Sequence, residues 1–277
     1  MRRPGPNLKR SDAEIAGLAE AARCVVEIHH AVARTLRIGV TLAEVDALVA
    51  DTLRSLGARS CFKGYKVGKH PPFPSHACLS VNDCVVHGHV GSYTKPMRPG
   101  DVLKIDVGVL KDGWIGDAAW SYAFGQPADE VARLMDCGKR SLDVAIPTLR
   151  PGNKLIDWPK ALQPFVESVC RFKLIRGLGG HGYGRSLHEP PYISNTTPLF
   201  LGEWPEAHQE VREGLVVAVE PMIATGSSQV EQTGNAWPMH TADGSQSVHY
   251  EADVLVTAEG PRVLTAGLED VNDVIDR

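Results

Sequence analysis

Apolar residues three and four positions apart mark the first long element of the chain. Ile15, Leu18, Ala22 and Val25 follow this spacing, which places them on one face of an α-helix. Ser11 opens a Ser-x-x-Glu capping box, a pattern that satisfies free backbone N–H groups where a helix begins. The pattern therefore predicts an amphipathic helix that starts just after Ser11 and buries its apolar face.

Helix boundaries recur along the chain. We expect the first helix to end at Gly39, a second capping box at Thr41 to start the next helix, and that helix to close at Gly57. A similar pair of segments starts near residue 128, where ADEVARLMDCGKRSLDVAIPTL precedes NKLIDWPKALQPFVESVC. The chain thus contains two predicted helix pairs.

Segments typical of strands follow each helix pair. They are DVLKIDVGVL and GWIGDAAWSYAF in the first half, and GLVVAVEPMI and SVHYEADVLVT in the second. The junction LRIGVTL of the first pair also resembles LRPGNKL of the second, at an offset of 113 residues. We infer an α+β domain made of two related halves, each a helix pair followed by antiparallel strands.

Composition and charge exclude several classes of protein. The 277-residue chain is 43% hydrophobic and 22% charged with a net charge of −4, so we expect a soluble globular protein that binds neither nucleic acid nor membranes. No apolar run reaches the roughly 18 residues of a membrane span. The six cysteines form no C-x-x-C pair, which favours reduced thiols in a cytoplasmic protein over a disulfide framework or a zinc finger.

Residues 1–10, MRRPGPNLKR, form the basic run of the sequence. The prolines and the terminal position of this run favour a disordered leader over a binding arm. No low-complexity linker divides residues 11–277, so we expect them to form a single domain.

Asp112 and Gly113 predict a tight hairpin turn, because both central positions of a type I′ turn need positive φ. A turn centred there places Gly108 opposite Asp117 and puts Asp106 on the same face, about 7–8 Å away. Two carboxylates so placed repel each other unless a cation or a shared proton compensates. The alternative is a pair of exposed aspartates on a sheet edge, but glycine inside these strands indicates close approach by another group.

Three further residues are candidates to join the two aspartates. His181 lies in GLGGHGYG, Glu220 ends the apolar run GLVVAVEP, and Glu251 lies in SVHYEADVLVT. Four carboxylates and one imidazole form an oxygen-rich ligand set, which suits hard or borderline divalent ions. Two divalent cations would balance the four negative charges.

Several motifs resemble those of the type I methionine aminopeptidases, metallopeptidases of the pita-bread fold. They are SVNDCVVHG, IDVGVLKDGWIGDAAW, GGHGYGRSLHEPP, VAVEPM and HYEADVLVT. His188 and Glu220 are only 32 residues apart, so the helical insert of the type II enzymes is missing. The resemblance covers nearly the whole chain and implies the pita-bread fold, in which two pseudo-symmetric halves surround one curved sheet.

The resemblance also implies a role for each candidate ligand. Asp106 would bind one metal ion, Asp117 and Glu251 would bridge two, and His181 and Glu220 would complete the ligands of the second ion. Glu220 would in addition carry a proton during catalysis. The ligand set suits Co²⁺, Mn²⁺, Fe²⁺ or Zn²⁺, and the sequence does not choose among them.

Two histidines complete the catalytic residues that the resemblance implies. His87 matches the histidine that contacts the substrate near the scissile bond, and His188 matches the one that stabilises the tetrahedral intermediate. Both would therefore bind substrate as well. The other substrate-binding candidates are Cys78, Leu187, Met222 and Trp237.

The sequence departs from the family pattern around the substrate pocket. Leu187 stands where the family usually has phenylalanine, and Ala252 and Asp253 follow Glu251 where it has His-Thr. A proline-rich insertion at residues 71–74 falls where the pocket tyrosines of the family come from. No metal ligand is lost, so the expected reaction stands, but the side-chain preference of the pocket is open.

The reaction implied by the resemblance is removal of the N-terminal methionine from peptides and nascent proteins with a small second residue. We expect a monomer, with the ribosome as a candidate partner. One alternative is an Xaa-Pro aminopeptidase or prolidase, although these relatives usually have glycine after the proline where this chain has VEPM. The other is a non-catalytic pita-bread module that binds peptides, although such modules typically lose metal ligands.

The remaining histidines are mostly expected to be structural. His29 lies on the apolar stripe of the first predicted helix, so we expect it to pack in the core. His89 and His249 flank candidate site residues and are candidates to support them from behind.

Overall fold

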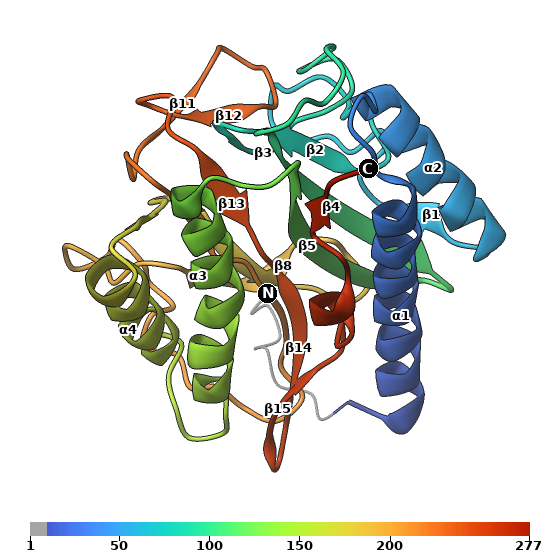
Figure 1. Ribbon diagram of the computed structural model, residues 1–277. Helices are drawn as coiled ribbons and strands as arrows, with labels where there is room; N and C mark the ends of the chain where they lie inside the picture. Colours follow the sequence, from blue (N-terminus) through green and yellow to red (C-terminus); the bar gives the residue numbers. More distant parts are fainter. Residues whose placement is uncertain (1–9) are drawn as a thin grey trace.

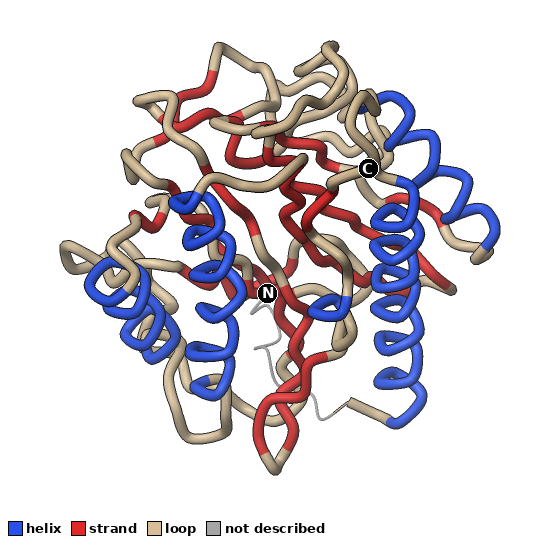
Figure 2. The backbone as a smooth tube through the Cα atoms, viewed as in Figure 1, coloured by secondary structure: helices blue, strands red, loops and turns tan. Residues whose placement is uncertain are grey.

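The computed structural model describes residues 10–277. Helices α1 and α2 lie on one flank of the central strands, and α3 and α4 lie on the opposite flank (Figure 1). Strands fill the space between the two helix pairs (Figure 2). The predicted leader, residues 1–10, lies outside the described residues except for Arg10, whose Nε donates to the carbonyl of Gly214 at 3.3 Å.

Both predicted capping boxes are present in the first helix pair. Helix α1 (Asp12–Thr35) starts after Ser11, and α2 (Leu42–Ser55) starts after Thr41. Each cap hydroxyl accepts the N–H of a glutamate three residues later, and that carboxylate accepts the N–H of the cap residue. Helix α2 closes as predicted, since Gly57 follows it with φ 60°.

The first helix ends earlier than predicted. Leu36 leaves the helical backbone at φ −55° and ψ 138°, and Gly39 lies in a later turn with φ 89°. Arg277 lies against this end of α1, where its Nε donates to the carbonyl of Leu36 at 2.9 Å and its guanidinium also donates to the carbonyl of Ala33 (Figure 1). The prediction for Gly39 was wrong because a distant side chain satisfies the last carbonyls of the helix.

The second helix pair is present without capping boxes. Helix α3 (Asp129–Ala145) leads through a short 3₁₀ turn, η1 (Ile146–Thr148), to α4 (Asp157–Pro164) and a π-helical turn, η2 (Phe165–Val169). Pro164 has no N–H to donate, so the regular helix ends there and the wider turn follows. Among the described residues, no helix combines the length and the apolar composition that a membrane span requires.

The hairpin predicted around Asp112 is confirmed. Strands β4 (Val102–Lys111) and β5 (Trp114–Phe124) are antiparallel. Gly108 pairs with Asp117, and Asp112 and Gly113 have φ 50° and φ 80°. Asp106 and Asp117 therefore share one face, as the register required.

Hydrogen bonding divides the strands of residues 10–277 into four sheets. One has β1 (Arg59–Ser60), β4, β5 and β16 (Val274–Ile275) in order, with β2 (Cys78–Val81) also on β4. The second has the order β15 (Gly260–Val263), β14 (Ala252–Thr257), β9 (Val216–Val219), β7 (Gly179–Gly182), β8 (Glu189–Ser194). The two small sheets are β13 (Ser247–His249), β10 (Met222–Ala224), β6 (Lys173–Leu174), and β11 (Val230–Gln232), β12 (Met239–Thr241), β3 (Cys84–Val86).

The two five-stranded sheets meet where β5 lies beside the start of β14. The N–H of Glu251 donates to the carbonyl of Ala119 at 2.9 Å, and the N–H of Asp117 donates to Oδ2 of Asp253 at 2.9 Å. These contacts join the two halves into the curved arrangement of the pita-bread fold, and the α+β class is confirmed. Candidate carboxylates therefore lie on the line where the halves meet.

Glycines in the hairpin allow close packing on both of its faces. A Cβ on Gly116 would lie 2.6 Å from the backbone carbon of Ala21 in α1, and a Cβ on Gly108 would lie 2.4 Å from Sγ of Cys61 and from the ring of Phe62. The close approach predicted from these glycines is thus made by α1 on one side and by the segment after β1 on the other.

Candidate metal centre and substrate pocket

A cavity of about 190 Å³ opens beside the hairpin and contains all five predicted metal ligands in its wall. The first half of the chain contributes two of them from β4 and β5. The second half contributes three, from β7 and from the ends of β9 and β14. These residues are Asp106, Asp117, His181, Glu220 and Glu251.

The tightest part of this cluster joins the two halves. Asp117, His181 and Glu251 each offer a ligand atom within 4.8 Å of the others. Nε2 of His181 lies 3.9 Å from Oδ2 of Asp117 and 3.9 Å from Oε1 of Glu220. A divalent ion binds nitrogen and oxygen at roughly 2 Å, so an ion fits between atoms at these separations.

The protonation of His181 follows from its neighbours. Its Nδ1 lies 3.0 Å from the carbonyl oxygen of Gly182, which only accepts, so Nδ1 carries the hydrogen. Burial, with a contribution from nearby His188, lowers the pKa of His181 to about 4. The ring is therefore neutral at pH 7 and presents the lone pair of Nε2 to the carboxylates, as a metal ligand requires.

The surroundings of the four carboxylates in the cluster disfavour their charged forms. Burial raises the pKa of each one, and repulsion among them adds to the effect; they are Asp106, Asp117, Glu220 and Glu251. Within residues 10–277, Oδ1 of Asp106 and Oδ1 of Asp117 have no hydrogen-bond partner. The donor set and these unpartnered oxygens fit divalent cations, which would relieve the repulsion.

The predicted substrate residues divide between two adjoining spaces. The cavity of about 190 Å³ is lined by five of them, which are His87, His188, Cys78, Leu187 and Trp237. Met222 lies instead on a more open groove of about 520 Å³, which shares His87, His181, His188 and Glu220 with the cavity. Met222 is therefore placed beside the outer groove and not in the wall of the inner cavity.

Aromatic side chains that the sequence did not single out form much of the cavity wall. The edge of Phe73 packs on Trp237 with ring centroids 5.3 Å apart, and Phe62 packs edge-on against Phe73 at 6.3 Å. Tyr65 and Val67 line the same cavity. Phe62, Tyr65, Val67 and Phe73 all come from residues 61–77, which we call the pocket loop. The prolines indicated a departure there but not which side chains would turn inward.

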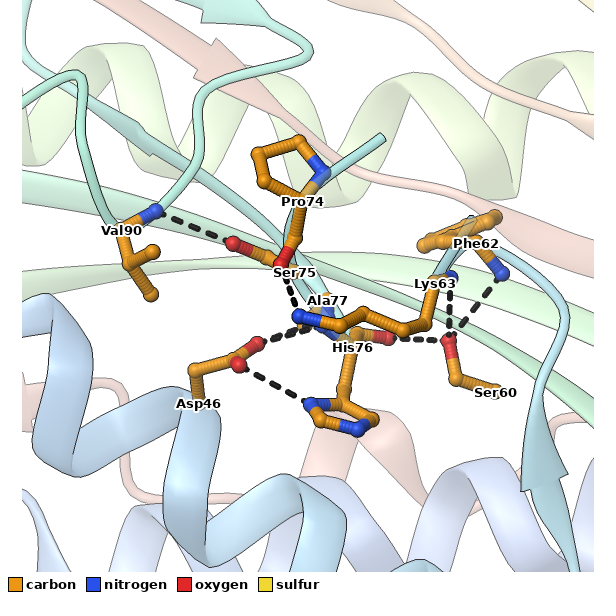
Figure 3. Close-up of polar contacts among 9 residues, drawn as sticks. All are labelled: Asp46, Ser60, Phe62, Lys63, Pro74, Ser75, His76, Ala77 and Val90. Atoms are coloured by element: carbon orange, nitrogen blue, oxygen red, sulfur yellow. Dashed lines mark hydrogen bonds and ion pairs between the residues drawn. The ribbon is translucent and has the colours of Figure 1, made fainter. Parts of the chain in front are cut away.

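Hydrogen bonds at its base hold the pocket loop in place (Figure 3). Oγ of Ser60 accepts the N–H groups of Phe62 and Lys63 at 3.0 and 3.1 Å, and it donates to the carbonyl of His76 at 2.6 Å. The carboxylate of Asp46 in α2 accepts the N–H of His76 at 2.6 Å and contacts its Nδ1 at 3.0 Å. Both ends of the loop are thus tied together and to α2.

The far side of the pocket loop packs on Trp237. The ring of His70 stacks on the indole at 4.7 Å, and Nε1 of Trp237 donates to the carbonyl of Pro71 at 2.8 Å. The proline-rich insertion therefore braces an aromatic wall of the cavity.

Two buried residues behind the cluster complete the site. Asp253 accepts the N–H of Asp117, while its Oδ1 has no hydrogen-bond partner among the described residues. Nε2 of His249 lies 3.3 Å from Oε2 of Glu220 and 4.0 Å from Oε2 of Glu251. The sequence indicated His249 by its position, whereas for Asp253 it offered only a departure from the family pattern.

His29 packs in the core as predicted, whereas His89 lies beside the pocket loop. His29 is fully buried, with Nδ1 3.0 Å from the hydroxyl of Tyr122 and Nε2 3.2 Å from the carbonyl of Ala118, so the packing role is confirmed. His89 makes its polar contacts with Gly91 and Ser92, and it meets the pocket loop through an edge-on contact with Phe73 at 6.1 Å.

Known proteins resemble this chain over most of its length. A family model described as metallopeptidase family M24 matches residues 16–258. Methionine aminopeptidase of Aquifex aeolicus is 34% identical over 260 residues, which is 92% of this chain and 97% of that protein. The crystal structure of methionine aminopeptidase from Thermotoga maritima matches with a TM-score of 0.84 at 33% identity, covering 93% of this chain and 98% of that one.

A proline-specific enzyme shares the fold at lower identity. The crystal structure of X-Pro aminopeptidase from Thermotoga maritima MSB8 matches with a TM-score of 0.71 at 20% identity, covering 96% of this chain but 63% of that one. This likeness concerns the fold alone. The family model, the identity to Aquifex aeolicus methionine aminopeptidase and the clustered ligand residues lead to one conclusion: the chain belongs to the metallopeptidase family M24.

Proposed function

We propose that this protein is an aminopeptidase that removes the N-terminal methionine from peptides and nascent proteins with a small second residue. The observation that carries the proposal is the shared cavity, in which an aromatic and aliphatic wall faces the carboxylate–histidine cluster. About 190 Å³ suits one side chain, and an unbranched thioether adapts well to an apolar, aromatic wall. The adjoining groove gives room for the residues that follow.

We assign the metal ligands as Asp106, Asp117, His181, Glu220 and Glu251, with Asp117 and Glu251 shared between two ions. Charge balance supports two ions, because four carboxylates need four positive charges. Bound divalent ions would act as Lewis acids on the peptide carbonyl and activate water for attack. Co²⁺, Mn²⁺, Fe²⁺ and Zn²⁺ all suit these ligands, and cellular supply would decide among them.

Three side chains are proposed to handle protons and bind the reacting peptide. Glu220 would accept a proton from the attacking water and return it to the leaving amine. Burial lowers the pKa of His87 to about 4 and also lowers the pKa of His188, so both rings are neutral at pH 7. His87 would contact the substrate near the scissile bond, and His188 would donate to the oxygen of the tetrahedral intermediate.

The methionine side chain is proposed to lie against the apolar part of the cavity. Cys78, Leu187 and Trp237 would form one part of this wall, and Phe62 and Phe73 of the pocket loop would form the rest. We further propose that residues 11–277 act as a monomeric, single catalytic domain in the cytoplasm, which the free state of all six cysteines supports. The ribosome is a candidate partner if nascent chains are the substrate.

Peptide hydrolysis tests the proposal. Protein reconstituted with Co²⁺ or Mn²⁺ should release methionine from Met-Ala-Ser, and neither leucine from Leu-Ala-Ser nor alanine from Ala-Pro-Ala. Asp117→Ala should abolish turnover, because it removes a ligand shared by both ions. Asp136→Ala is the matched control, since Asp136 is an exposed aspartate paired with Arg140 on α3.

The outcomes separate the candidate functions. Cleavage before proline alone would replace the proposal with an Xaa-Pro aminopeptidase. Absence of hydrolysis together with absence of metal binding would replace it with a peptide-binding module. Normal turnover by Asp117→Ala would refute the assignment of the shared ligand.

A further inference from the structure

Tyr65 of the pocket loop contacts one of the proposed catalytic histidines. Its hydroxyl oxygen lies 2.8 Å from Nδ1 of His188, and the two rings are 5.5 Å apart at an angle of 57°. Within the described part of the chain, this hydroxyl has no other hydrogen-bond partner. The contact joins residues that are 123 positions apart, so it depends on how the pocket loop is folded.

We propose that Tyr65 is a positioning residue that donates its hydroxyl hydrogen to Nδ1 of His188 and thereby keeps the hydrogen of the imidazole on Nε2. This inference rests on the proposed function, because it concerns how His188 meets the developing oxyanion. The reaction proposed above gives Tyr65 no role.

The chemistry of imidazole makes this contact consequential. A neutral ring has one N–H donor and one bare nitrogen, and the partner of one nitrogen decides the state of the other. If Nδ1 accepts from Tyr65, Nε2 must carry the hydrogen and can donate it to an oxyanion. If Nδ1 instead donates to Tyr65, Nε2 is bare and repels the same oxygen.

The surroundings favour the hydroxyl as donor. Burial raises the pKa of Tyr65, so the phenol keeps its hydrogen near pH 7 and has it available to donate. Nδ1 of His188 is the one acceptor within hydrogen-bond distance of this hydroxyl among the described residues. Donation from tyrosine to Nδ1 uses the one hydrogen of the phenol and leaves the Nε2–H of His188 free for an oxygen of the substrate.

The pocket loop fixes the backbone of Tyr65 on both sides. Its N–H donates to the carbonyl of Phe62 at 2.8 Å, and its carbonyl accepts the N–H of Phe73 at 2.9 Å. Phe62 and Lys63 are held in turn by Ser60, and the amine of Lys63 donates to the carbonyl of Pro74 (Figure 3). The hydroxyl is therefore presented to His188 by an ordered backbone before substrate binds.

The first arm of the test measures kinetics with Met-Ala-Ser. Tyr65→Phe keeps the aromatic ring that lines the cavity and removes only the hydroxyl. We expect kcat to fall about tenfold while KM stays within about twofold, because one hydrogen bond that orients a donor is lost while apolar contacts remain. Tyr93→Phe is the control, since the hydroxyl of Tyr93 bonds Asp101, outside the cavity. Unchanged kcat for Tyr65→Phe, or an equal fall for Tyr93→Phe, would overturn the proposal.

The second arm reads the tautomer directly and does not depend on activity. Zinc-loaded protein with ¹⁵N-labelled histidine gives separate signals for protonated and bare ring nitrogens, and His188→Asn assigns those of His188. We expect a protonated Nε2 in the wild type and a mixed or reversed pattern in Tyr65→Phe. A protonated Nδ1 in the wild type, or the same pattern in both proteins, would overturn the proposal. A wild type that hydrolyses no methionyl peptide would refute the proposed function, while the tautomer result would still decide the role of Tyr65.

Discussion

Removal of the Asp253 carboxylate should weaken metal binding without touching a metal ligand. Asp253 is fully buried, and its Oδ2 accepts the N–H of Asp117 at 2.9 Å. Such a hydrogen bond contributes about 0.5–1.5 kcal/mol when the carboxyl is neutral and about 1.5–3 kcal/mol when it is charged. If this energy helps to hold Asp117 in its proposed binding position, Asp253→Ala should weaken the affinity for a divalent ion by about 10–100-fold, which is the usual effect of losing a partner of a ligand.

A comparison of two substitutions separates hydrogen bonding from charge at this position. Asp253→Asn keeps an oxygen acceptor of the same shape, so it should retain most of the affinity if orientation of Asp117 is what matters. Competition with a chromophoric chelator gives the dissociation constant for Mn²⁺ or Co²⁺, and far-ultraviolet circular dichroism checks the fold. Wild-type affinity in a folded Asp253→Ala protein would refute the reasoning. Equal losses in both variants would instead make charge the dominant factor.

Three further predictions concern the core and the pocket loop. Burial lowers the pKa of His29 from 6.5 to about 4, so the unfolded state binds the extra proton between these values. Protonation of His29 in the unfolded state should therefore lower the free energy of unfolding by about 3 kcal/mol as the pH falls from 6.5 to 4. Urea unfolding at the two pH values should show a smaller decrease for His29→Phe than for the wild type, and an equal decrease in both proteins would contradict this. Gly116→Ala should lower the free energy of unfolding by about 1–3 kcal/mol, because its Cβ would lie 2.6 Å from the backbone of Ala21; an unchanged urea midpoint would exclude the clash. Ser60→Ala should raise KM for Met-Ala-Ser severalfold and lower kcat by less than Tyr65→Phe does, because it releases Phe62 and loosens the backbone that presents Tyr65; steady-state kinetics with an unchanged KM would show that the loop needs no such anchor.

The sequence predicted that the candidate ligands lie close together, and they line one cavity; for the two aspartates, local rules were enough. Asp112 and Gly113 determine the turn, and the pairing of Gly108 with Asp117 then follows from the register of the hairpin. The order of motifs along the chain supplied the remaining ligands through a resemblance. These inferences needed the period of a strand, the chemistry of a turn and the preference of divalent ions for oxygen, all of which can be read from short segments.

Contacts between distant segments were beyond the reach of the same rules. Arg277 ends α1 by donating to carbonyls about 240 residues away, which no cap pattern near Gly39 reveals. The proline-rich segment marked a departure from the family, but the inward direction of Tyr65 and Phe73 depends on backbone N–H groups of the pocket loop that donate to Ser60 and Asp46. Asp253 was recognised as an unusual residue, whereas its contact with Asp117 required the pairing of the two halves.

The candidate ligands are divided between the two halves of the chain, with β4 and β5 on one side and β7, β9 and β14 on the other. An ion held by Asp117, His181 and Glu251 would therefore act as a cross-link between halves that are otherwise joined by packing and a few hydrogen bonds. Because such an ion binds the folded state and not the unfolded one, each tenfold rise in its free concentration above the dissociation constant adds about 1.4 kcal/mol to stability. The resistance of this protein to heat and proteolysis should then follow the metal supply of the cell, and removal of the ions should loosen the seam between the halves first.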